Sequence, residues 1–444
     1  MTESGLSPEF LDAAQREAFA YFLHEANPEN GLIADKTAPG SPASIAAVGF
    51  ALTAYPVGAE RGLLSRTDAI ARVRATLRFF DASVQSAEAD ATGYKGFYYH
   101  FLDMKSGRRA WDCELSTIDS AILLAGMLAA AAYFSGDSDE EREIRELADR
   151  LYRRADWNWA RNGGATVTHG WKPKRGFLGY RWEGYCEALI LYLLGLGSPT
   201  HPLPAESYAR WTDTYAWRNL YGHEFVYAGP LFIHQFSHIW VDFRGIRDAY
   251  MREKQSDYFE NSRRATLAQR QYAIANPSHF AGYGPNGWGI SASDGPGPAS
   301  FTTKGVKRRF FGYLARGAPD GPDDGCLAPW AVAASLPFAP EIVGPVLRHF
   351  AELKLRENNP YGFDTTFNAT IAERTKPAQV WISPFHFGIN QGPVVLMVEN
   401  HRTGLVWEMM KRCPYLVDGL RRAGFSGGWM RDASDLTTQV PSEN

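Results

Sequence analysis

Long, almost wholly apolar segments alternate along this chain with charged amphipathic segments. The apolar segments show no polar face, which is typical of helices enclosed by neighbours. They span residues 44–55, 116–133, 184–196, 229–243, 326–336 and 391–410. The amphipathic segments are typical of helices with one face in water and span residues 8–24, 65–80, 137–156, 205–219, 258–275 and 340–355. The alternation predicts an all-α fold, an (α/α)6 toroid (barrel) of six inner and six outer helices; a helical bundle or an open solenoid is the competing arrangement.

Local signals support several of these boundaries. Ser7 before Pro8 has the pattern of an N-cap followed by proline at the first helical position. Residues 65–68 have a Ser-x-x-Asp pattern close to a capping box. Strand-like pieces occur only in long loops, at 96–101, 166–180 and 282–301. Because repeated helical hairpins can build one unit of this size, we expect a single catalytic domain over residues 1–444, with long loops forming a cleft at one rim.

Charge and cysteine usage exclude several function classes. A formal net charge of −3 gives no electrostatic case for binding nucleic acid or an anionic membrane. The longest apolar run, 121–134, is too short to cross a bilayer. We expect free thiols rather than a zinc site or a disulfide framework, because the cysteines are far apart, at Cys113, Cys186, Cys326 and Cys413. The start of the chain has no signal-like pattern, so a cytoplasmic protein or a periplasmic one with a trimmed signal is expected.

Aromatic residues are more numerous than a helical core requires. The chain has 13 Trp, 21 Tyr and 26 Phe, and many of them lie in Gly-rich loops rather than on apolar stripes. Aromatic rings in loops suit the faces of sugars. Acidic residues at the starts of the inner helices would add hydroxyl-binding groups at one rim, which predicts a site for a polyhydroxylated substrate.

Glu187 is the clearest candidate for chemistry. It stands at the head of the apolar run 185–194, where a charge is costly unless it is used or paired. An apolar setting raises the pKa of a carboxyl group and makes it a general acid. The alternative is a buried ion pair with one of the arginines. Tyr185, beside Glu187, is a candidate for substrate binding.

Glu114, Ser116 and Asp119 open the second inner helix. Two carboxylates at a helix start can bind sugar hydroxyls or share acid and base roles. The alternative for Asp119 is local, because Ser-x-x-Asp is close to a capping box.

His234, His238 and Asp242 lie at four-residue spacing, which is compatible with a metal site. Gln235 stands where a zincin motif requires glutamate, so neither a metal nor any other cofactor is predicted. His234 and Gln235 are instead candidates for binding sugar hydroxyls, or for hydrogen bonds within the core.

Two loops combine residues suited to sugar binding. Trp288 and Asp294 lie in one loop, and Asp323 and Asp324 lie in a Gly-Pro-Asp-Asp-Gly turn. The alternative for both loops is ordinary turn chemistry, in which Asp, Gly and Pro are common. No phosphate loop, nucleophile elbow or dinucleotide fingerprint is present in the sequence.

Five stretches form longer, more specific motifs: residues 114–119 (ELSTID), 195–202 (GLGSPTHP), 234–238 (HQFSH), 257–266 (DYFENSRRAT) and 321–325 (GPDDG). Together they resemble the glucoamylase-like domain family, which includes the bacterial β-1,2-glucanases of glycoside hydrolase family 144. The match extends from about Gly31 to Trp429. The resemblance implies an (α/α)6 barrel, in agreement with the helix alternation.

The resemblance also implies hydrolysis of β-1,2-glucan by an inverting mechanism without metal. Glu187 matches an acidic residue associated with catalysis in that family, and Asp119 matches an acidic position at the cleft. Asn390 stands where the family usually has Asp, so activity or products are expected to differ if that carboxylate serves catalysis or recognition. We therefore expect Glu187 and Asp119 to be catalytic, and substrate to be bound by Glu114, Tyr185, His234, Gln235, Trp288, Asp294, Asp323, Asp324 and Asn390.

Other functions fit the same pattern less well. A β-1,2-glucan transglycosylase on this scaffold is the alternative enzyme, because water and sugar acceptors compete for one cleft. The alternative from another functional class is a catalytically silent glycan-binding protein. In that case Asn390, which stands where the family usually has Asp, would be a first loss from the catalytic machinery. A terpene cyclase is disfavoured because residues 321–325 lack an Asp-x-Asp-Asp motif. The pattern favours neither endo nor exo attack.

Overall fold

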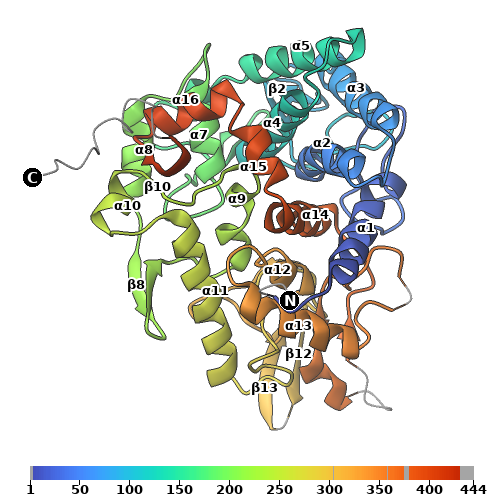
Figure 1. The fold of residues 1–444 in the computed structure, drawn as a ribbon, viewed down its shortest axis with the longest axis vertical. Coiled ribbons are helices and arrows are strands. Elements are labelled where there is room, and N and C mark those ends of the chain that lie inside the picture. The colour runs from blue at the N-terminus through green and yellow to red at the C-terminus, as the bar shows by residue number, and fades with distance from the viewer. Residues whose placement is uncertain (1–3, 304, 358, 375–379, 431–444) are drawn as a thin grey trace, which may run out of the picture.

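Helices carry most of the regular structure. The computed structural model describes residues 4–303, 305–357, 359–374 and 380–430. Its α-helices are α1 (Pro8–His24), α2 (Ile45–Glu60), α3 (Arg66–Ala82), α4 (Thr117–Tyr133), α5 (Asp139–Arg154), α6 (Trp157–Ala160), α7 (Leu189–Gly197), α8 (Ala205–Thr212), α9 (Phe236–Trp240), α10 (Ala249–Glu253), α11 (Tyr258–Ala275), α12 (Pro329–Ala333), α13 (Pro340–Glu352), α14 (Gly388–Arg402), α15 (Leu405–Met410) and α16 (Pro414–Arg422) (Figure 1). Short 3-10 helices occupy Leu231–His234 (η1), Ala369–Arg374 (η2) and Gly428–Met430 (η3).

Serine caps fix the starts of the first helices. The Ser7 side chain accepts a hydrogen bond from the third following backbone N–H, and Ser65 does the same at α3, as predicted. Ser44, Ser116 and Ser138 cap α2, α4 and α5 in the same way. Each cap satisfies a backbone donor that the helix itself leaves free. These starts are therefore specified locally.

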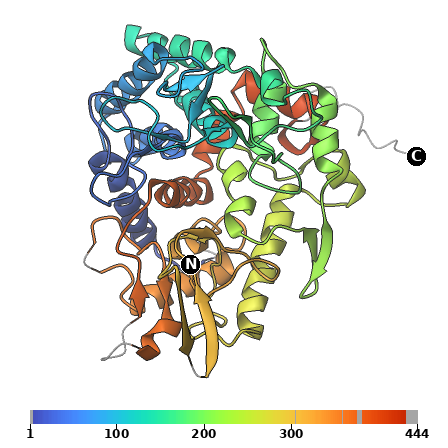
Figure 2. The ribbon, with the colours of Figure 1, turned by 180° about the vertical axis from the view of Figure 1, so that it is seen from behind.

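The apolar helices pack on one another in a closed ring. Helix α2 contacts α4, α4 contacts α7, α7 contacts α9, α9 contacts α14, and α14 returns to α2. Figures 1 and 2 show α14 between α2 and α12. Nearly every residue of α2, α4 and α7 is buried, whereas α3, α5 and α13 bury one face. The difference follows the apolar and amphipathic patterns of the sequence.

Several predicted inner helices are shorter than the apolar runs that contain them. The run 184–196 becomes helical only at Leu189, and the run 326–336 is helical only over α12. The run 229–243 divides into η1 and α9, separated by Gln235. The run 391–410 divides into α14 and α15 because Gly404, with φ of 71°, ends the first helix. Apolar periodicity locates buried segments, but it does not show where they break.

Short strands occupy the loops, a feature that the all-α description omits. They are β1 (Ala43–Ser44), β2 (Gly93–Tyr94), β3 (Phe97–Tyr99), β4 (Phe101–Leu102), β5 (Leu115–Ser116), β6 (Gly170–Lys172), β7 (Gly176–Phe177), β8 (Trp217–Leu220), β9 (His223–Val226), β10 (Ile246–Arg247), β11 (Ala292–Ser293), β12 (Ala299–Thr303), β13 (Val306–Phe310), β14 (Leu314–Ala315), β15 (Phe367–Asn368), β16 (Trp381–Ile382) and β17 (Ser426–Gly427). All named pairs are antiparallel. The predicted outer segment 205–219 is helical only over α8 and then enters the β8–β9 hairpin.

One sheet matters for the site because it leads directly into α4. Its strand order is β2-β3-β5-β6-β7, and in its register Tyr98 lies opposite Ser116 and Leu115 lies opposite Trp171. Strand β1 leads in the same way into α2 and pairs with β4. The strands thus hold the N-terminal ends of α2 and α4 near the loop that carries residues 97–102.

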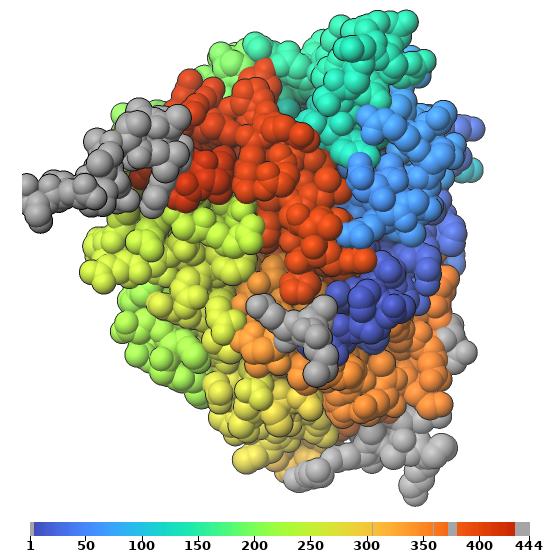
Figure 3. All heavy atoms as spheres, in the orientation of Figure 1, coloured from blue at the N-terminus to red at the C-terminus, as the bar shows by residue number. Residues whose placement is uncertain are grey.

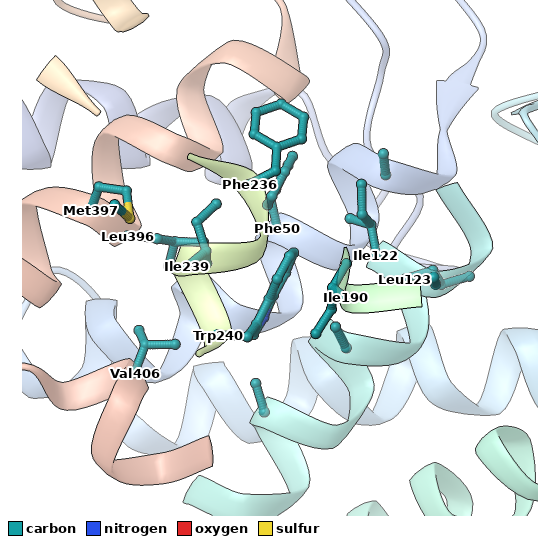
Figure 4. Close-up of a cluster of buried hydrophobic side chains, with 14 of the residues drawn as sticks. Phe50, Ile122, Leu123, Ile190, Phe236, Ile239, Trp240, Leu396, Met397 and Val406 are labelled. Carbon is teal, nitrogen blue, oxygen red and sulfur yellow. The ribbon is translucent and has the colours of Figure 1, made fainter. Parts of the chain in front are cut away.

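Part of the hydrophobic core lies between the ring helices. Phe50 of α2 and Trp240 of α9 stack with ring centroids 5.6 Å apart and planes within 5° (Figure 4). The indole N–H of Trp240 donates to the Thr53 hydroxyl at 3.0 Å, which satisfies its polar atom. Ile122 and Ile190 pack around this pair from α4 and α7 (Figure 4).

Glycines allow α2 and α4 to approach closely. A Cβ atom on Gly126 would lie 2.1 Å from the carbonyl oxygen of Gly49, and one on Gly49 would lie 2.4 Å from the carbonyl oxygen of Ile122. Any larger residue at either position would separate the two backbones.

The described helices include none that is both long and apolar enough to span a bilayer. On the face shown in Figure 3, the C-terminal helices, in red, lie against the N-terminal part, in blue, in agreement with the packing of α14 on α1.

Candidate functional site

A cavity of about 550 Å³ opens where the N-terminal ends of the ring helices meet. Its wall includes Ser44 before α2, Asp119 of α4, Glu187 before α7 and Asn390 of α14. The volume lies in the range usual for small-molecule sites. Four of the eleven predicted site residues line this cavity: Glu114, Asp119, Glu187 and Asn390.

Glu187 lies in the turn that precedes α7 and is half-buried. Burial raises the pKa of its carboxyl group to about 7, and the negative charge of Asp119 adds to the rise, against a smaller opposing effect of a backbone hydrogen bond. The Glu187 carbonyl accepts a hydrogen bond from the Ser237 hydroxyl at 3.0 Å, which fixes the turn. A carboxyl group with this pKa is about half protonated at neutral pH, and its protonated form can donate the proton.

Asp119 is tied to the start of its own helix. Its backbone N–H donates to the Ser116 hydroxyl oxygen at 3.2 Å, and the Ser116 hydroxyl donates to the Asp119 carboxylate. The local capping interaction considered from the sequence is therefore present. Asp119 also lines the cavity, with 6% of its surface exposed. The two roles coexist because the cap uses one of the two carboxylate oxygens.

His100 was not predicted as a site residue, and the segment 96–101 that contains it was predicted only as a strand-like piece. Its Nδ1 lies 2.8 Å from Oε1 of Glu114, and its Nε2 lies 3.7 Å from Oδ2 of Asp119. Burial opposes protonation, but Asp119, the hydrogen bond to Glu114 and the charge of Asp35 outweigh it and raise the pKa of His100 to about 9. The cavity wall therefore carries an imidazolium between two carboxylates.

Asp35 is a second residue that the sequence analysis missed. Its backbone is fixed by a hydrogen bond from its N–H to the Pro42 carbonyl (2.7 Å) and by one from the Gly388 N–H to its own carbonyl (2.9 Å). Burial raises the pKa of the Asp35 carboxyl to about 6, with Lys36 and His100 acting in the opposite direction. No local motif marks Asp35, because residues 31–40 form an irregular loop.

Asn390 combines burial with an unused amide. Only 1% of its surface is exposed, and neither side-chain polar atom has a hydrogen-bond partner within the described part of the chain. A buried amide without partners costs free energy, so such a group in a cavity wall is available to a ligand. Tyr313, whose ring centroid lies 5.1 Å from that of Phe387, completes this side of the cavity.

Aromatic rings form another part of the wall. His169 and Trp182 stack with centroids 3.9 Å apart, and the indole N–H of Trp182 donates to the Thr117 hydroxyl at 2.9 Å. Trp111 also lines the cavity and is 64% exposed, with its ring edge-on to Phe101. Aromatic rings from loops therefore line the cavity, at residues the sequence analysis did not name.

Three predicted substrate-binding residues lie behind the wall, not in the cavity. Tyr185 is buried and stacks on Tyr258. His234 lies with Nε2 3.1 Å from the Ala228 carbonyl oxygen, and the Gln235 amide donates to the Ala331 carbonyl at 2.7 Å. The bonded polar groups of His234 and Gln235 therefore serve the core, the alternative already considered for these two residues.

Four predicted loop residues also lie outside the cavity wall. Trp288 is fully buried, and the Asp294 carboxylate accepts a hydrogen bond from the Ser383 hydroxyl at 2.9 Å. Asp323 accepts hydrogen bonds from two tyrosine hydroxyls, and Asp324 pairs with Arg316. The sequence could not separate Asp323 and Asp324 from Asp119, because all three stand near the starts of apolar segments.

The stripe considered as a metal site is occupied by protein contacts. His238 Nε2 lies 2.9 Å from the Ser262 hydroxyl, and Asp242 pairs with Arg244 and Lys411. In the residues that the structure describes, no group of three or more His, Cys, Asp or Glu side chains could hold a metal ion. The four cysteines are buried free thiols, as predicted.

Comparisons with known proteins agree on the family. Residues 179–414, more than half of the chain, match the Glycoamylase family model, described as "Putative glucoamylase". The chain is 27% identical to an exo β-1,2-glucooligosaccharide sophorohydrolase (non-reducing end) of Parabacteroides distasonis, over 93% of this chain. It spans only 57% of the length of that relative.

Two solved structures share the fold over nearly their whole length. The crystal structure of a "putative glucoamylase" from Bacteroides uniformis is 32% identical with a TM-score of 0.83, covering 96% of this chain and 99% of that one. An endo-β-1,2-glucanase from Chitinophaga pinensis, in complex with sophorotriose and glucose, is 27% identical with a TM-score of 0.82, covering 95% and 99%. The family match and these likenesses place this chain in the Glycoamylase family.

Proposed function

We propose that this protein is a glycoside hydrolase that cleaves β-1,2-glucan or β-1,2-glucooligosaccharides. The observation that carries the proposal is a protonatable Glu187, with a pKa of about 7, in the same 550 Å³ cavity as the Asp119 carboxylate. The pairing of a carboxylic acid with a carboxylate is what glycoside hydrolysis requires. The similar proteins named as a sophorohydrolase and as an endo-β-1,2-glucanase support the β-1,2 linkage.

The proposed fold for this activity is an (α/α)6 toroid formed as a single domain over residues 1–444. The closed packing of α2, α4, α7, α9 and α14 supports it, as do the amphipathic helices outside that ring. In such a fold the helix starts face one rim. The cavity at those starts is then the catalytic cleft.

The proposed reaction is inverting and uses two carboxyl groups. Glu187 donates its proton to the glycosidic oxygen as the bond from that oxygen to the anomeric carbon breaks. A water molecule attacks the anomeric carbon from the opposite face, and Asp119 accepts the proton that the water loses. Glu114 and Asn390 are placed to bind sugar hydroxyls, and Trp111 and Trp182 offer ring faces.

Product chromatography after incubation with linear β-1,2-glucan tests the proposal. Short glucooligosaccharides without longer products are the expected result. Products longer than the substrate would favour a transglycosylase, in which a sugar hydroxyl replaces water. Binding without any product would favour a catalytically silent glycan-binding protein. The absence of both binding and cleavage would reject β-1,2-glucan as the ligand.

A further inference from the structure

We propose that His100 is a positioning residue: by bridging Glu114 and Asp119 as an imidazolium, it keeps negative charge on Asp119 and leaves the mobile proton on Glu187. This inference rests on the proposed function and adds to it the group that separates the roles of the two catalytic carboxyls. His100 belongs to neither the predicted catalytic pair nor the predicted sugar-binding residues.

The His100 ring is held in a fixed orientation. It stacks on Phe101 with centroids 4.0 Å apart and planes within 10°. The His100 N–H donates to the Glu114 carbonyl at 3.0 Å, and the Ile45 N–H donates to the His100 carbonyl at 3.3 Å. The backbone therefore joins His100 to the starts of both α2 and α4, and each ring nitrogen faces one carboxylate.

The charges around His100 favour its protonated form. Glu114 and Asp119 face the two ring nitrogens, and Asp35 adds a third negative charge from the loop before α2. Lys36, the nearby cation on that loop, acts on Asp35. Burial opposes the imidazolium, but the carboxylates outweigh it, so the ring carries a positive charge across the neutral range.

The positive charge of His100 bears on which of the two proposed catalytic carboxyls, Glu187 or Asp119, holds the proton. Glu187 and Asp119 are close enough that the charge of Asp119 raises the pKa of Glu187. Two such carboxyls compete for one proton, and the asymmetry of their surroundings decides which of them holds it. Asp119 has the Ser116 hydroxyl and the imidazolium beside it, whereas Glu187 has an apolar setting. Both differences place the proton on Glu187.

The first test observes His100 directly and needs no substrate. In a proton NMR titration, the His100 signal is assigned by its absence from the spectrum of His100→Gln. We expect its titration midpoint near pH 9, and a midpoint closer to pH 6.5 in Glu114→Gln and in Asp119→Asn. Titration near pH 6.5 in the unaltered protein would contradict the bridge.

The second test uses kinetics with linear β-1,2-glucan. His100→Gln keeps a polar group but not the charge. It is expected to lower kcat by about 10- to 100-fold with little change in KM, as for a misplaced catalytic group. The pH profile of kcat/KM should change on its acidic side, because the positive charge beside the Asp119 carboxylate is lost. Added imidazole should partly restore His100→Ala.

A matched control is available on the surface. His349 lies 3.8 Å from Glu352 in an exposed pair that is not part of the cavity wall, and His349→Gln should leave both kcat and the pH profile unchanged. An unaltered pH profile in an active His100→Gln would overturn the inference while leaving the proposed function intact. Absence of any cleavage by the unaltered protein would instead contradict the proposed function, and the NMR titration would still test the bridge.

Discussion

Arg316 and Asp324 form a fully buried ion pair. Their side chains are 0% exposed, with Nε to Oδ1 at 2.7 Å and Nη2 to Oδ2 at 2.9 Å. Arg316 also donates to the Ser293 carbonyl at 2.6 Å, so the pair connects the loop that follows α11 with the turn before α12. A carboxylate that the sequence suggested for sugar binding thus holds two loops together.

Asp324→Asn should destabilise the fold by about 3–5 kcal/mol, because it leaves a buried guanidinium without its counter-charge. The free energy of unfolding from urea titration measures this loss. The control is Asp320→Asn, which removes an exposed partner of Arg218 and should cost less than about 1 kcal/mol. A cost below about 1 kcal/mol for Asp324→Asn, together with weaker sugar binding, would instead support Asp324 as a sugar-binding residue.

Glu187→Gln should keep the fold and the affinity for sugar while lowering kcat by at least about 100-fold, the lower end of what general acid catalysis contributes. The amide occupies the same volume but has no proton to donate. Steady-state kinetics and oligosaccharide binding measure the two effects. The control is Glu183→Gln, at an exposed position four residues earlier in the chain, whose kcat should stay within about twofold of that of the unaltered protein. Near-normal turnover in Glu187→Gln would remove Glu187 from the mechanism.

The pH profile should report the same group. Because the pKa of Glu187 is raised to about 7, its protonated fraction falls as the pH rises past that value. A general acid acts only when it is protonated, so kcat/KM should fall about tenfold per pH unit above about pH 7. The residual activity of Glu187→Gln should lack this limb. A profile that stays flat to pH 9 would be incompatible with Glu187 as the acid.

The sequence predicts best those features of the structure that depend on contacts between residues close together in the chain. Caps such as Ser7 and Ser65 act within three residues, so the starts of α1 and α3 were predicted correctly. The break between α14 and α15 depends on one glycine conformation, which apolar periodicity does not reveal.

The site was predicted only in part for the same reason. Glu187 stands out because a single charge heads an apolar run. Asp35 and His100 reach the cavity through pairing between segments far apart in sequence, such as β1 with β4 and Asp35 with Gly388. Asp323 and Asp324 resembled site residues because the sequence does not show that tyrosine hydroxyls and Arg316 bind them.

Activity should survive exhaustive treatment with EDTA. The reason is that His234, His238 and Asp242 each have protein partners, so binding a metal there would require those contacts to break. The measurement is the rate of glucan cleavage after chelation and gel filtration. Loss of activity that a single divalent ion restores would overturn both this expectation and the metal-free mechanism.

The stereochemistry of the first product tests the mechanism most directly. An inverting enzyme must leave room for a water between its carboxyl groups, so Glu187 and its partner should lie about 6.5 to 9.5 Å apart, against about 5 to 5.5 Å in a retaining pair. Asp119 is the first candidate for that partner because it lines the cavity with Glu187, whereas Asp294 accepts a hydrogen bond from Ser383 outside the wall. Proton NMR of the first product should therefore show the α-anomer. An initial β-anomer would require a covalent intermediate and a nucleophile close to Glu187, and transglycosylation would then become the better account of the cavity.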